Sequence, residues 1–151
     1  MSPQRKGLRL LLDTNVVIAG LLWKGVPQQL LERAVHDDSV HLFTSHALLQ
    51  ELEETLDYPK FAARLTLFDT SAGELALHYA RLAEVVGTAP AVRVVPGDPD
   101  DDHVIAAAVA AAADLIVTGD KRHLLPLGSL FGIDIVTPRQ ALERLTGDRI
   151  G

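Results

Sequence analysis

Short segments rich in leucine and β-branched residues alternate with longer segments of helical periodicity along this 151-residue chain. The alternation predicts parallel strands that are covered by helices on both faces. We expect strands at Leu8–Leu12, Val40–Ser45, Val92–Val95, within residues 114–120, and at Gly132–Thr137. The predicted fold class is α/β, a three-layer α/β/α arrangement with a central, mostly parallel sheet of about five strands, in one domain spanning residues 1–151.

Capping residues place the helices between these strands. Pro27 suits the first turn of a second helix, and Ser45 suits the N-cap of a third. Ser71 and Glu74 have the spacing of a capping box, and the helix they open is predicted to end at Gly87. The other expected helices are Val16–Leu22, short pieces within residues 59–69, the segment after the aspartates of residues 98–102, and a last helix after Thr137 with Pro138 and Gln140 in its first turn.

Composition excludes several classes of site. The chain has no cysteine, so a disulfide, a thiolate zinc site and a cysteine nucleophile are impossible, which suits a cytoplasmic protein. The formal net charge of −6 argues against binding nucleic acid by bulk positive charge, although an enzyme could still meet phosphate through a metal ion. The longest apolar run, Val104–Ala113, is too short to span a bilayer, and we expect no membrane association.

Acidic residues follow the ends of several predicted strands. Asp13 comes directly after the first strand, and Asp120, in "VTGD", follows the fourth. Glu51 lies about two turns into the helix that leaves the second strand, and the acidic stretch "PGDPDDD" follows the third. Because the carboxyl ends of parallel strands share one edge, where α/β proteins bind ligands, these carboxylates are expected to converge there.

Helical spacing selects among the aspartates of that stretch. Asp102 heads a predicted apolar stripe of one helix face that continues through Ile105, Ala106, Val109 and Ala113. It is therefore expected to point over the strand ends, with the neighbouring Asp101 as a secondary candidate. Asp98 and Asp100 are expected to cap the helix or face water.

Converging carboxylates need a partner. Two like charges 4 Å apart cost about 4 kcal/mol at an effective dielectric constant near 20, in a fold of about 5–15 kcal/mol total stability. Protonation would relieve the repulsion, and so would a divalent cation. Carboxylate ligands favour Mg²⁺ or Mn²⁺, which take phosphate oxygens as further ligands, and this is the chemistry of phosphodiester cleavage.

Each acid also has a purely structural interpretation. Asp13 could cap the following helix, Glu51 could be a solvated helix residue, Asp102 could interact with a helix dipole, and Asp120 could begin a turn. Their joint occurrence at one predicted edge favours the functional interpretation.

The histidines do not predict a zinc site. His36, His41 and His46 fall on three different predicted elements and share no face. His103 and His123 adjoin proposed ligands, and we interpret both as surface groups and not as bases.

Four stretches, "LLLDTNVVIAGLL", "ELEETL", "DDDHVIAAAVAAAADLIVTGDKRHL" and "GIDIVTPRQAL", together resemble the PIN-domain family. The likeness is greatest to the VapC-like toxin ribonucleases of prokaryotic toxin–antitoxin pairs, and it extends from about Leu8 to Leu145. The resemblance implies a metal-dependent nuclease acting on RNA. It also implies a homodimer and a small antitoxin protein that holds the enzyme inactive.

The resemblance assigns roles by position. The catalytic acids and ligands of Mg²⁺ or Mn²⁺ would be Asp13, Glu51, Asp102 and Asp120, and the supporting polar residues would be Asn15 and Thr118. One departure concerns the fourth ligand. Many VapC-like chains have asparagine at the position of Asp120 and an acid three residues later, where this chain has His123.

Two other functions remain open at this stage. A haloacid-dehalogenase-like phosphatase would use Asp13 as its nucleophile, but such enzymes place a second aspartate where this chain has Asn15. They also need a phosphate-orienting lysine, for which Lys121 is poorly placed beside Asp120. The other alternative is a catalytically inactive PIN-like module that binds a protein partner.

Overall fold

A central sheet of six strands organises the part of the chain that the computed structural model describes, residues 7–87 and 99–150. Its order is β3-β2-β1-β4-β6-β5, and every pairing is parallel except that of β5 with β6. The strands are β1 (Leu8–Leu12), β2 (Val40–Ser45), β3 (Glu84–Val86), β4 (Leu115–Val117), β5 (Ser129–Leu130) and β6 (Ile133–Val136). The predicted α/β class with a mostly parallel sheet is confirmed.

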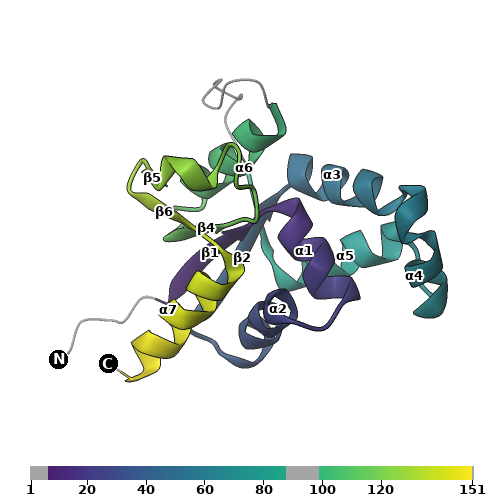
Figure 1. Cartoon of the computed structure of the whole chain (residues 1–151), viewed down its shortest axis with the longest axis horizontal. Helices are drawn as coiled ribbons and strands as arrows, with labels where there is room; N and C mark the ends of the chain where they lie inside the picture. The colour runs from purple at the N-terminus through teal and green to yellow at the C-terminus, as the bar shows by residue number, and fades with distance from the viewer. Residues whose placement is uncertain (1–6, 88–98, 151) are drawn as a thin grey trace.

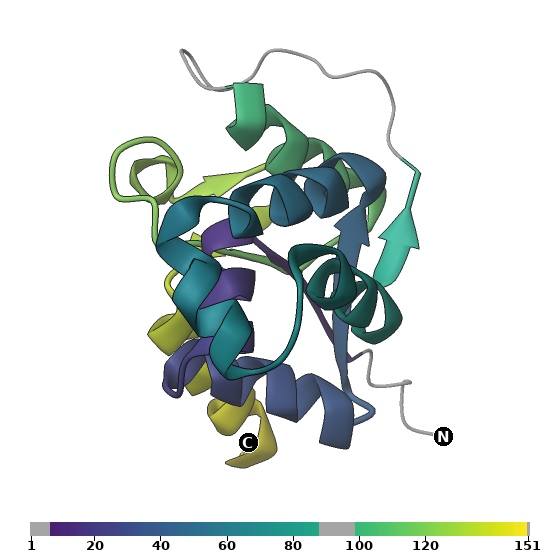
Figure 2. The ribbon, with the colours of Figure 1, turned by 90° about the vertical axis from the view of Figure 1, so that its right-hand side faces the viewer.

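Helices cover both faces of this sheet (Figure 1). They are α1 (Thr14–Leu22), α2 (Val26–His36), α3 (His46–Leu56), α4 (Ala62–Leu67), α5 (Ala72–Leu82), α6 (Pro99–Ala110) and α7 (Pro138–Ile150), with 3₁₀ turns η1 (Pro59–Phe61) and η2 (Leu125–Leu127). Figure 2 shows α3, α4 and α5, in blue to teal, on the side that faces the viewer. Within the described ranges, no helix has both the length and the apolar character needed to cross a bilayer.

Alternating strand residues build two cores, one on each face of the sheet. Leu10 of β1 packs in the core that includes α1, α2 and α7, whereas the next residue, Leu11, packs in the core that includes α6. Ile116 and Val117 of β4 divide in the same way. Because both faces are covered, β1 and β4 consist mainly of apolar residues, as parallel strands usually do.

Several predicted boundaries match the structure, and one is wrong. The strands Leu8–Leu12 and Val40–Ser45 form at the predicted residues, whereas the helix expected to reach Gly87 ends at Leu82. The residues Glu84–Val86 instead form β3, which pairs with the end of β2 (Figure 2). Strand pairing satisfies backbone groups that one more helical turn would also satisfy, and β-branched valines favour the strand.

Two further strands differ from expectation. The two-residue strand β5 was not predicted, because so short a segment has no recognisable alternation of apolar and polar residues. The predicted strand Val92–Val95 lies outside the described residues.

The order of the strands creates a switch point between β1 and β4. The chain runs from β1 outward through β2 to β3, and then returns to place β4 on the opposite side of β1. Leu12 at the end of β1 is in register with Val117 at the end of β4, so Asp13 and Thr118 follow side by side. Open α/β sheets bind ligands at such a point, beyond the carboxyl ends of the strands.

Helix α6 brings its first turn to the same edge of the sheet. The chain leaves α6 at Ala110 and enters β4 at Leu115, at the amino end of that strand. The helix therefore runs opposite to the strand direction. Asp101 and Asp102 in its first turn lie at the carboxyl edge, close to the switch point.

A glycine permits close packing of α1 on α2, and this contact can be tested. A Cβ atom at Gly20 would lie 2.7 Å from Leu31 Cδ1 and 3.0 Å from the backbone oxygen of Pro27. We predict that Gly20→Ala lowers the free energy of unfolding by about 1–3 kcal/mol, measured by urea denaturation, despite the higher helix propensity of alanine.

The matched control is Gly73→Ala in the first turn of α5. A Cβ atom there would approach only the Glu53 side chain, at 3.7 Å or more, which is ordinary contact. This variant is expected to be as stable as the wild type or up to about 1 kcal/mol more stable. Equal effects of the two substitutions would show that the packing of Gly20 is not the cause.

Candidate metal centre

Asp13 is fixed in orientation by two hydrogen bonds. It is the N-cap of α1, where its Oδ1 accepts from the backbone N–H of Thr14 at 2.7 Å. Its Oδ2 accepts from the hydroxyl of Thr118 at 2.8 Å. The side chain is buried, with 9% of the residue exposed. Asp13 therefore does cap α1, as one interpretation predicted. Its second oxygen also connects it to Thr118, directly after β4.

Thr118 joins two of the predicted ligands. Its hydroxyl donates to Asp13 and accepts from the backbone N–H of Asp120 at 3.0 Å. The residue is fully buried, and its backbone N–H donates to the oxygen of Val136 on β6. A hydroxyl can donate once and accept at the same time, so this side chain sets the relative positions of both aspartates.

Asp120 occupies a turn immediately after β4. Its Oδ1 accepts from the backbone N–H groups of Arg122 at 2.9 Å and His123 at 3.1 Å. Partial burial raises the pKa of the Asp120 carboxyl, but these two hydrogen bonds, a hydrogen bond with the Asp101 side chain and the charge of His123 together hold it below its usual value. Asp120 is therefore ionised at neutral pH.

Both aspartates in the first turn of α6 are buried. Asp101 is 6% exposed and Asp102 is 2% exposed. The predicted stripe is partly confirmed, because Ile105 and Ala113 are buried, and partly wrong, because Val109 is half-exposed. The buried face also includes Val104, Ala107, Ala108 and Ala111. In a run of alanines the apolar periodicity cannot set the rotation of the helix, so it did not separate Asp101 from Asp102. Asp98 and the side chain of Asp100 lie outside the described residues.

Three side chains gather into a cluster that could hold a metal ion. Asp101, Asp120 and His123 each offer one ligand atom, and these atoms lie within 4.8 Å of one another. The Nδ1 atom of His123 is 3.8 Å from Asp101 Oδ2 and 3.6 Å from Asp120 Oδ2. The cluster includes one of the four predicted ligands, Asp120, and the secondary candidate Asp101.

Sequence reasoning placed His123 at the surface and did not include it in the site. Its side chain is 38% exposed, yet the imidazole faces two carboxylates. The signal that could have identified it was its position, three residues after Asp120, where many VapC-like chains have an acid.

The remaining predicted residues lie around this edge of the sheet. Glu51 is partly buried on α3, a helix that packs against α1 and α6. Asn15 is exposed in the first turn of α1. The metal-binding and catalytic roles of Asp13, Glu51, Asp102 and Asp120 stay predictions.

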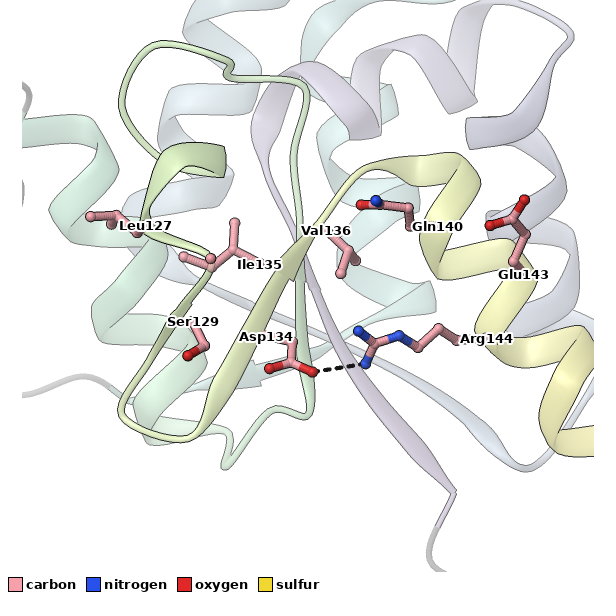
Figure 3. A pocket seen from close by; sticks show the side chains of 9 residues that line it. Leu127, Ser129, Asp134, Ile135, Val136, Gln140, Glu143 and Arg144 are labelled. Carbon is pink, nitrogen blue, oxygen red and sulfur yellow. Dashed lines mark hydrogen bonds and ion pairs between the residues drawn. The ribbon is translucent and has the colours of Figure 1, made fainter.

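A polar cleft of about 730 Å³ lies elsewhere, between β6 and α7 (Figure 3). Asp134 and Arg144 form an ion pair of 2.9 Å across it, and both side chains are nearly half-exposed. None of the candidate ligands lines this cleft. An exposed ion pair contributes little, so the functional site is better placed at the buried carboxylates.

The donors at the carboxyl edge are suitable for a divalent cation. Buried carboxylates come from the residue after β1 and from α6, a partly buried one comes from the turn after β4, and an imidazole lies beside two of these groups. Burying several carboxylates without a counter-charge is unfavourable, and a divalent cation would neutralise them. Oxygen donors with one nitrogen match Mn²⁺ and related ions.

The hydrogen bond between Thr118 and Asp13 can be tested with a double-mutant cycle. Thr118→Val keeps the shape but removes the hydroxyl, leaving the Asp120 N–H and a buried carboxylate without their partner. We predict a loss of about 1–3 kcal/mol in the free energy of unfolding, measured by urea denaturation.

Thr118→Ser is the control, because it keeps the hydroxyl and loses about 1 kcal/mol through one methyl group. In the double variant Thr118→Val/Asp13→Asn, the change in the free energy of unfolding is expected to differ from the sum of the two single changes by at least about 0.5 kcal/mol, as for other residues in one hydrogen-bond network. Additive effects would mean that the two side chains do not interact energetically.

Comparison with known families identifies the chain. The PIN domain family matches residues 9–122, most of the sequence, whereas a comparison with curated proteins gives no match. PIN domains are generally nucleases, and they use divalent metal ions. The matched segment includes all four predicted ligands and ends one residue before His123. The chain belongs to the PIN-domain family.

Proposed function

We propose that this protein is an endoribonuclease that depends on Mg²⁺ or Mn²⁺ and hydrolyses phosphodiester bonds of RNA in the cytoplasm. One observation carries the proposal. At the switch point of the sheet, Thr118 links the carboxylate of Asp13, directly after β1, to the backbone N–H of Asp120 after β4, and Asp120 lies beside the buried Asp101 of α6. These acidic residues from three separate segments lie at the edge where α/β proteins bind ligands, which supports the proposal.

The ligands of the ion would be Asp13, Glu51, Asp102 and Asp120, with Asp101 supporting them. A bound divalent cation would lower the pKa of a coordinated water and would polarise a phosphoryl oxygen. No side chain of the protein acts as a nucleophile in this proposal, which distinguishes it from a phosphatase that forms a phospho-aspartate.

The chain's own residues contribute orientation. Both oxygens of Asp13 are held by neighbouring groups, so the carboxylate needs no rearrangement when substrate binds. The low pKa of Asp120 keeps that carboxylate available as a ligand at neutral pH. Because Thr118 is fully buried, its hydroxyl holds Asp13 and the backbone of Asp120 without exposure to solvent.

Basic residues next to the site support a phosphate substrate. Lys121 and Arg122 directly follow Asp120 and are exposed at this edge. Such side chains position a nucleic-acid backbone by contacting its phosphates. They offset the net negative charge near the site, so the chain needs no large basic surface to bind RNA there.

Removal of either principal aspartate tests the mechanism. We predict that Asp13→Asn and Asp102→Asn each lower Mn²⁺-dependent cleavage of a fluorescently labelled RNA at least about 100-fold, because a ligand to the ion is lost. Circular dichroism and thermal melting should show that each variant is folded.

Asp57→Asn, at an exposed aspartate that ends α3, is the matched control and should cleave like the wild type. Retained cleavage by the Asp13 variant would remove that residue from the mechanism. A phosphorylated Asp13, trapped with a phosphate monoester, would favour the phosphatase alternative.

We further propose that the protein is the toxin of a toxin–antitoxin pair and that it forms a homodimer. An apolar groove of about 480 Å³ supports a protein partner. Its apolar lining comes from α1, α2, α5 and the segment between α4 and α5, and comprises Leu21, Leu31, Val35, Phe68, Leu75 and Leu82. Val35 and Phe68 are each about half-exposed, so an antitoxin segment packed on this groove would bury them. Light scattering should give twice the mass of one chain.

Expression in a bacterial host tests the toxin role separately from the chemistry. Induction of the wild-type chain should stop growth and degrade cellular RNA, whereas the Asp13→Asn variant at the same level should do neither. Growth rate and RNA integrity are the measurements. Normal growth with an abundant, active wild-type enzyme would exclude a toxin and leave the nuclease proposal intact.

A further inference from the structure

We propose that His123 is a direct ligand of the divalent cation and gives the centre a preference for Mn²⁺ over Mg²⁺. The inference rests on the proposed nuclease function, because it concerns the same ion. It goes beyond the acidic site that the family resemblance implies, since it adds a nitrogen donor and a metal preference specific to this chain.

The position of the imidazole carries the inference. Its Nδ1 atom faces Asp101 Oδ2 at 3.8 Å and Asp120 Oδ2 at 3.6 Å. These separations are too long for hydrogen bonds. They are short enough for the three atoms to become ligands of one ion after small side-chain adjustments, because they lie between the two separations found among octahedral ligands. Ligands about 2.1 Å from a metal lie about 3.0 Å apart in adjacent octahedral positions and about 4.2 Å apart in opposite ones.

The turn after β4 aims the ring at the carboxylates. Asp120 Oδ1 is occupied by the backbone N–H groups of Arg122 and His123, which leaves Oδ2 toward the ring. The next residue, Leu124, is fully buried in the core beneath α6 and anchors the turn. The ring therefore has a fixed backbone position on one side of the cluster.

Asp101 closes the cluster from the other side. It comes from α6, so it is independent of the turn that carries Asp120 and His123. The carboxylate is buried, and its Oδ2 atom is inaccessible to solvent and faces the imidazole. An imidazole between these two carboxylates would add a nitrogen donor beside Asp120, one of the proposed ligands, and Asp101, its supporting acid.

The chemistry of the donors sets the metal preference. Mg²⁺ favours carboxylate, carbonyl and water oxygens, whereas imidazole nitrogen binds transition ions more strongly. An acid at position 123 would make the cluster all oxygen. A histidine there weakens the binding of Mg²⁺ relative to Mn²⁺.

Electron spin-echo envelope modulation of the Mn²⁺-loaded full chain, freed of any histidine tag, tests this directly. A directly bound imidazole nitrogen gives a ¹⁴N coupling in the spectrum. We expect this coupling in the wild type and its loss in His123→Gln. The Mn²⁺ dissociation constant of that variant, measured by calorimetry, should be about 10-fold larger.

Two further variants serve as controls. His103→Gln replaces a histidine next to Asp102 on α6 and should keep both the coupling and the affinity. His123→Asp restores an oxygen ligand, so it should lose the nitrogen coupling but bind Mg²⁺ more tightly than the wild type, reversing the preference.

The outcomes separate this inference from the proposed function. If the wild type binds Mn²⁺ and cleaves RNA, but shows no coupling that depends on His123, the inference fails and the nuclease stands. If it binds no Mn²⁺ at millimolar concentration and cleaves no RNA, both fail. An unchanged ratio of Mg²⁺ to Mn²⁺ affinity in His123→Asp would also overturn the preference.

Discussion

The hydrogen bond between Thr118 and Asp13 ties the fold to the site. It exists because β1 and β4 pair in parallel, with Leu12 in register with Val117, so the next residue of each strand meets the other at the sheet edge. A slip of one residue would turn every side chain of a strand to the opposite face. The apolar strands therefore fix the register, and the register fixes the distance between two acids.

Burial of these acids has a cost in free energy. Asp13, Asp101 and Asp102 are almost completely buried. In a buried environment an ionised carboxylate is strongly disfavoured unless it is hydrogen-bonded or bound to a cation. Natural proteins accept such local strain at functional sites and offset it with packing elsewhere. Here the two apolar cores on either side of the sheet supply that stability.

Much of the fold could be predicted from local patterns. The strands that begin at Leu8 and Val40 and the capping box at Thr137, where Gln140 accepts from the threonine N–H, follow from residues close together in sequence. What could not be predicted depends on distant contacts. Tertiary packing decides three such features: the pairing of Glu84–Val86 with β2, the buried face of the alanine-rich α6, and the approach of His123 to Asp101. Each depends on residues far apart in the sequence, so local patterns do not predict it.

The two lateral borders of the sheet are short. β3 has three residues and β5 has two, so the described borders offer few backbone groups to an additional strand. Short border strands are one way in which proteins avoid joining their sheets edge to edge. A protein that binds this chain would therefore gain little by extending the sheet. It would do better to pack side chains between helices, as an amphipathic helix does in a groove.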